Sequence, residues 1–107
     1  MPSEGISIRK LHAIPLPDMK RVTVEMELSP FTEHPNLDIS ILSPEGEVAA
    51  NMFVVEARDQ VMALTLHLHQ PEPAALYTAR LTVLRGEEIL DRREVTFALH
   101  AEIKEEQ

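Results

Sequence analysis

The stretch Arg21-Val-Thr-Val-Glu-Met-Glu-Leu28 alternates strictly between apolar and polar side chains. Its even-numbered positions are all apolar, whereas Thr23, Glu25 and Glu27 stand between them. Because successive side chains on a β-strand point to opposite faces, this pattern predicts a strand with one face in a core and the other in water. An amphipathic helix would instead repeat its apolar residues three and four positions apart. The stretch therefore indicates a half-buried antiparallel strand.

The same alternation recurs along the chain. Apolar residues occupy every second position in 37–41, 62–68, 77–83 and 95–99, and a weaker run covers 6–11. Ser43-Pro44-Glu45-Gly46 and Arg85-Gly86-Glu87-Glu88 lie between such runs and carry residues that favour tight turns. Short alternating runs separated by turns are typical of an antiparallel β-sandwich.

The segment 47–56 is the least regular part of this pattern. Its apolar residues do not alternate, and its Ala and Met residues favour a helix. A helix over 47–69 is the alternative, but it would be apolar on every side and would contradict the alternation from Val61 to His69. We therefore predict a strand over 47–56 and a turn at 58–60, which makes about seven strands.

The size and composition fit one globular domain. The chain has 107 residues, of which 44% are hydrophobic and 26% are charged. We expect a single all-β domain over 1–101, followed by a charged tail over 102–107 that is disordered.

Several classes of function are disfavoured by composition. The absence of Cys excludes disulfides, thiolate zinc sites and cysteine nucleophiles. A net charge of −8 and the scarcity of aromatic residues argue against nucleic acid as a partner. No apolar run approaches the roughly 20 residues of a membrane span, and Met1–Lys10 does not read as a signal peptide. We expect a soluble cytoplasmic protein, or a module of a larger one, that does not bind membranes.

The order of the strands and the stretch 71–83 resemble immunoglobulin-like and fibronectin type III-like domains, in particular the small bacterial members of this superfold. The resemblance implies an immunoglobulin-like antiparallel β-sandwich of about seven strands. It also implies a structural role for Tyr77, whose hydroxyl would bond back to the upstream backbone as a tyrosine corner. Because the superfold hosts many unrelated functions, the resemblance implies little about activity.

No motif for catalysis is present. The chain has neither a nucleophile elbow nor a dinucleotide fingerprint, and its three glycines leave little room for a phosphate-binding loop. Its carboxylates fall on the expected outer faces and in turns, where they would be solvated. We therefore predict no catalytic residue, no cofactor and no enzymatic activity, a hydrolase included.

His67 and His69 form one candidate metal site. Residues two apart on a strand point the same way, so both imidazoles could reach one cation such as Zn²⁺. In an immunoglobulin-like layout the fifth strand pairs with the second, whose Glu25 and Glu27 could supply carboxylate ligands. The simpler alternative is ordinary cross-strand pairing of His and Glu. The other histidines, His12, His34 and His100, are expected in loops or on the surface.

The segment 47–56 also has more apolar residues than one buried face requires. Contiguous exposed apolar residues often mark interfaces, so Val48, Met52, Phe53 and Val55 are the candidate contact residues. A bulge, a sheet switch or cover from the loop 31–34 would be the structural alternatives. The sequence thus predicts a non-catalytic interaction or accessory module that binds another protein chain or its own copy as a homodimer. A divalent-metal or small-ligand binding protein is the alternative.

Overall fold

The computed structural model describes residues 5–72 and 74–99, and these residues form seven β-strands and no helix. The strands are β1 (Ile8–Pro15), β2 (Arg21–Leu28), β3 (Asn36–Leu42), β4 (Val48–Val54), β5 (Val61–His67), β6 (Leu76–Arg85) and β7 (Glu88–Ala98). The expected all-β class is confirmed. Within the segment 47–56, residues Val48–Val54 form a strand, so this part of the chain is not helical, and the strand is shorter than predicted.

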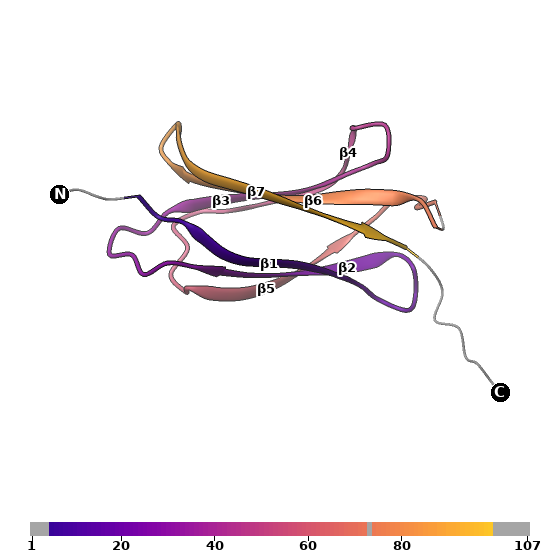
Figure 1. The fold of residues 1–107 in the computed structure, drawn as a ribbon, viewed down its shortest axis with the longest axis horizontal. Helices are drawn as coiled ribbons and strands as arrows, with labels where there is room; N and C mark the ends of the chain where they lie inside the picture. The colour runs from indigo at the N-terminus through magenta and orange to yellow at the C-terminus, as the bar shows by residue number, and fades with distance from the viewer. Residues whose placement is uncertain (1–4, 73, 100–107) are drawn as a thin grey trace.

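The strands form two antiparallel sheets that pack face to face (Figure 1). One sheet has the order β1-β2-β5, and the other has the order β4-β3-β6-β7. The fifth strand pairs with the second, as the immunoglobulin-like layout implies. Each sheet therefore ends in two edge strands, and β4 is one of them.

The core lies between the two sheets and is built from the alternating apolar positions. Every even-numbered residue of β2 is at most 2% exposed. Leu37, Ile39 and Ile41 of β3 are fully buried and lie opposite Val83, Leu81 and Ala79 of β6. Full burial of such a side chain contributes about 1.5–3 kcal/mol. The period-2 pattern thus fixes which face of each sheet turns inward.

Glycine is required at two of the connecting turns. Gly46 has a φ of +89°, and its N–H donates to the Ser43 carbonyl at 2.8 Å. Gly86 has a φ of +59° in the tight turn between β6 and β7. Residues with a side chain rarely adopt such angles, so both glycines define where a strand reverses.

Tyr77 anchors the connection that precedes β6. Its hydroxyl accepts a hydrogen bond from the backbone N–H of Glu72 at 2.9 Å. The residue is 4% exposed, and its ring stacks on Phe97 with the centroids 6.0 Å apart. This is the upstream backbone bond that the resemblance to immunoglobulin-like domains implies.

The two long sides of the sandwich differ. On one side, β1 and β7 are joined across the sheets, because the Ile8 N–H donates to Asp91 Oδ2 at 2.8 Å and Arg93 Nη1 donates to the Arg9 carbonyl at 3.3 Å. On the other side, β4 and β5 approach each other as the last strands of their sheets. The candidate contact residues, which lie on β4 or directly after it, are therefore on the side opposite these bonds between β1 and β7.

The two ends of the sandwich carry different loops (Figure 1). The β2–β3, β4–β5 and β6–β7 connections share one end, and the β1–β2, β3–β4 and β5–β6 connections share the other. In the part of the chain that the structure describes, no helix is long and apolar enough to cross a membrane. His100 and the predicted tail over 102–107 lie outside the described residues.

Candidate functional site

The outer edge of β4 is the candidate site. β4 pairs with β3 on one side only, because it ends the sheet order β4-β3-β6-β7. Backbone N–H and C=O groups alternate in direction along an antiparallel strand, so those that point away from β3 have no partner strand within residues 5–72 and 74–99. Such an edge is a template for pairing with another extended segment.

The side chains of this segment divide between two faces. Val48 is 62% exposed, Phe53 is 50% exposed and Val55 is 66% exposed. Met52 lies opposite the buried Ile39 and packs against the core, so it is only partly accessible. Of the four predicted contact residues, three are thus exposed, and the register with β3 turns Met52 inward.

A bulge interrupts β4 near its start. Ile41 lies opposite Ala50 and Leu42 lies opposite Val48, so Ala49 has no partner on β3. The extra residue shifts the alternation at 48–50, whereas beyond it Ala50, Met52 and Val54 alternate with the exposed Asn51 and Phe53. The pattern is hidden there because exposed positions such as Phe53 and Val55 are also apolar. The loop residue Phe31 packs against the core and leaves Phe53 uncovered. The bulge is therefore present, whereas the alternative of a loop that covers Phe53 is not.

β4 differs from the edge strands on the opposite long side in its charge. β1 contains Arg9 and Lys10, and β7 contains several Asp, Glu and Arg residues. β4 contains no charged residue and no Pro. Soluble proteins commonly protect their edge strands with charge or Pro, so the bare edge of β4 is consistent with a contact surface.

A hollow lined by carboxylates lies at each end of β4. Beside its start, a cavity of about 170 Å³ is lined by Val48, the exposed Glu45, Glu47 and Glu72, and His69. Beside its end, a cavity of about 270 Å³ is lined by Val55, Glu56, Glu33 and Arg85 among others. An uncharged edge thus lies between two acidic hollows.

Sequence reasoning missed these two hollows. The glutamates were interpreted only as a solvated surface, because single positions in turns do not reveal which of them meet in space. The sequence does hold a clue, since Glu45 and Glu47 precede an uncharged run and Glu56 follows it. Glu72 could not have been placed there without the fold.

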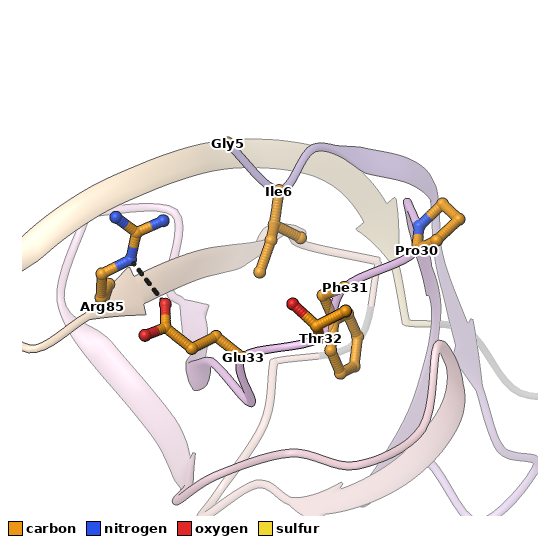
Figure 2. Close-up of a pocket in the computed structure, with 7 residues that line it drawn as sticks. All are labelled: Gly5, Ile6, Pro30, Phe31, Thr32, Glu33 and Arg85. Atoms are coloured by element: carbon orange, nitrogen blue, oxygen red, sulfur yellow. Dashed lines mark ion pairs between the residues drawn. The ribbon is translucent and has the colours of Figure 1, made fainter. Parts of the chain in front are cut away.

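A larger cavity opens at the end of the sandwich that carries the β2–β3 and β6–β7 connections (Figure 2). It has a volume of about 620 Å³ and is lined by Gly5, Ile6, Pro30, Phe31, Thr32, Glu33 and Arg85. Arg85 Nε lies 3.5 Å from Glu33 Oε1, and the Ile6 side chain points toward the space between this ion pair and the side chains of Phe31 and Thr32. Both charged side chains are substantially exposed, so the pair contributes little to stability.

The structure does not bring the four predicted metal ligands together. His67 lies opposite Arg21 on β2, whereas Glu25 lies opposite Ala63 and Glu27 lies opposite Val61. Glu25 is four residues along β2 from Arg21, a separation of about 13 Å. Among the described residues, no group of three or more His, Asp or Glu side chains is placed to hold a metal ion. Binding of Zn²⁺ by His67 and His69 without these carboxylates stays a prediction.

The other histidines lie at separate places in the fold. His12 lies opposite Glu25 in the β1–β2 ladder and is exposed. His34 contacts the Phe31 ring edge-on with the centroids 6.2 Å apart. His69 follows the end of β5 and lines the hollow at the start of β4. None of these positions joins the histidines into one cluster.

Comparison with known proteins identifies the fold. No family model matches the chain, and no curated protein matches it. A solved β-glucuronidase from Ruminococcus gnavus, in complex with D-glucaro-d-lactam, is similar with a TM-score of 0.64 at 17% identity, over 88% of this chain and 16% of the enzyme chain. A β-glucuronidase from glycoside hydrolase family 2 is similar with a TM-score of 0.65 at 18% identity, over 88% of this chain and 12% of that chain.

These likenesses support the two-sheet β-sandwich fold of this chain. At this level of identity they show the fold alone. The chain spans less than a fifth of the length of either enzyme.

Proposed function

We propose that this chain is a non-catalytic accessory module that binds another protein chain through the free edge of β4. The partner contributes an extended segment that continues the sheet β4-β3-β6-β7 as an additional strand. Main-chain hydrogen bonds give such a contact its affinity, and side chains on alternate positions give it specificity. The observation that carries the proposal is the exposed, uncharged edge of β4 with Phe53 and Val55 beside it.

The comparisons support an accessory rather than a catalytic role. In both β-glucuronidases the similar part is a small fraction of a longer enzyme chain. A sandwich of this size in such a chain is suited to packing against other domains. The proposal extends this kind of role to the present chain.

Site-specific cross-linking followed by reconstitution tests the proposal. A photoreactive amino acid at position 53 in the native cell should capture the partner, whereas the same group at the exposed position 76 on β6 should not. The captured protein is then purified and its affinity is measured with purified variants. Phe53→Lys should weaken binding about tenfold or more, because a charge beside the paired edge disfavours strand addition.

Leu76→Lys is the matched control, because Leu76 is 58% exposed and lies on another strand. It introduces the same charge and should leave the affinity within about twofold. Equal weakening by Phe53→Lys and Leu76→Lys, or no weakening by either, would contradict the proposal.

A further inference from the structure

We infer that the segment bound by β4 is a strand-forming peptide with apolar residues at alternate positions and a basic residue near each end. This inference rests on the proposed function and adds the chemistry of the partner. It is drawn from what lies beside the two ends of β4, where the uncharged edge meets carboxylates. The occupant is a different chain and not a second copy of this one.

The hollow at the start of β4 is acidic. Glu45, Glu47 and Glu72 line it, and all three are exposed. Within the described residues none of the three takes part in an ion pair. A Lys or Arg side chain extending from the first residues opposite β4 would meet three carboxylates without displacing a cation.

The hollow at the other end has the same sign. Glu33 and Glu56 line it together with Arg85. Arg85 is already shared between carboxylates, with Nε 3.5 Å from Glu33 and Nη1 3.9 Å from Glu88. The guanidinium therefore does not reverse the negative character of this end, and Glu56 remains available to a second basic side chain.

The distance between the two hollows sets the spacing of the basic residues. Glu47 and Glu56 flank β4 and are nine positions apart in the sequence. At about 3.3 Å per residue, nine fully extended steps would span roughly 30 Å, and the bulge at Ala49 and the left-handed backbone of Glu56 (φ +53°) shorten this distance. The partner should therefore carry its basic residues about eight positions apart, one on each side of a core that matches the seven residues of β4. A shorter segment could reach only one hollow.

Charge also argues against a second copy as the occupant. Two identical edge strands related by a two-fold axis must pair antiparallel. Such a pair would place Glu47 of each copy next to Glu56 of the other. It would also join two chains that each carry a net charge of −8. A basic partner gains from the same carboxylates that repel a copy.

Three synthetic peptides test the inference on the full chain. The first alternates Thr and Val over about seven residues, the length of β4, and carries Lys at both ends. The second has the same core with Glu at both ends, and the third has Lys at both ends of a core of three residues. Fluorescence anisotropy of labelled peptides measures the affinities. The first should bind roughly tenfold more tightly than either of the others at low salt.

The preference for the Lys-flanked over the Glu-flanked peptide should depend on Glu47 and Glu56. Glu47→Gln/Glu56→Gln should remove most of the difference between the Lys-flanked and Glu-flanked peptides. Glu25→Gln/Glu94→Gln changes the net charge equally at exposed positions on β2 and β7, outside both hollows, and should preserve the difference. Raising the salt concentration to about 0.5 M should also reduce the difference, because exposed charges are screened.

The outcomes separate the inference from the proposed function. Equal binding of the Lys-flanked and Glu-flanked peptides would overturn the inference while leaving strand addition in place. A preference of the chain for a second copy over the Lys-flanked peptide would likewise overturn the inference and leave strand addition in place. Failure of all three peptides would also overturn the inference, and the reconstitution with Phe53→Lys would then decide the proposed function by itself.

Discussion

Tyr77 ties the connection between β5 and β6 to the start of β6 through one buried hydroxyl. We expect Tyr77→Phe to lower the free energy of unfolding by about 1 kcal/mol, because the Glu72 N–H loses its acceptor while the ring still stacks on Phe97. Urea denaturation measures this change. Tyr77→Leu should cost more, since it also removes ring packing. An unchanged midpoint for Tyr77→Phe would show that the bond contributes nothing.

Asp18 gives a second prediction at the scale of one residue. The backbone N–H of Lys20, first, and then the Arg21 side chain lower the pKa of the Asp18 carboxyl. Because the folded-state pKa is lowered, this contribution to stability is fully present above the unfolded-state pKa. It is lost as the pH falls through the folded-state pKa.

Asp18→Asn should therefore lower the melting temperature at pH 7, and its effect should shrink as the pH falls through the lowered folded-state pKa of Asp18 and the wild-type carboxylate becomes protonated. Thermal unfolding at a series of decreasing pH values measures this difference. Asp59→Asn removes another exposed carboxylate, in the β4–β5 loop, and serves as the control. A difference between Asp18→Asn and wild type that stays constant with pH would contradict the prediction.

Residue identity predicted some of these roles but not the grouping of residues in space. The role of Tyr77 could be assigned because its position near the start of a predicted strand matches the tyrosine corner that the resemblance to immunoglobulin-like domains implies. The placement of Glu25 near His67 could not be assigned, because the register of β2 against β5 decides which side chains face each other. A displacement of four residues moves the carboxylate by about 13 Å. Register depends on turns and on the whole core, which no single residue encodes.

At the scale of the elements, the closure of β1 on β7 is the contact most open to test. The Ile8 N–H donates to Asp91 Oδ2, and Ile8 is 2% exposed. Asp91→Ala should lower the free energy of unfolding by about 1–3 kcal/mol, because it leaves a buried donor unpaired. Asp91→Asn retains an oxygen acceptor and should cost less. Urea denaturation of both variants would refute this account if their midpoints were the same.

The strands themselves were largely predictable, because alternation of apolar residues directly reflects burial on one face. β2 matches its predicted range, and β3, β5 and β6 follow their predicted runs. The segment of β4 is harder to interpret because the bulge at Ala49 shifts the period at its start and because Phe53 and Val55 are apolar at exposed positions. Its position at the end of a sheet was also not fixed by the pattern. An edge strand is one that pairs with a neighbouring strand on one side only, and the order of strands in a sheet is a property of the whole fold.

At the scale of the whole molecule, charge and shape act together on the choice of partner. The chain carries 18 acidic and 10 basic side chains, yet none of these lies on β4. Electrostatic repulsion between two copies therefore comes from charged residues that flank β4, such as Glu47 and Glu56, and not from β4 itself. This arrangement keeps the edge available to a partner strand while it disfavours pairing between identical molecules.

Reversing one charge should turn this repulsion into attraction. In an antiparallel pair of β4 strands, Glu47→Lys would place a new ammonium group beside Glu56 of the other copy, twice per pair. We expect this variant to form dimers at low salt at concentrations where the wild type is a monomer, as measured by sedimentation velocity. Glu47→Lys/Glu56→Lys restores like charges at the same contacts and should return the chain to a monomer. Dimers of equal strength for the single and double variants would show that the edge of β4 does not respond to the charges at its ends.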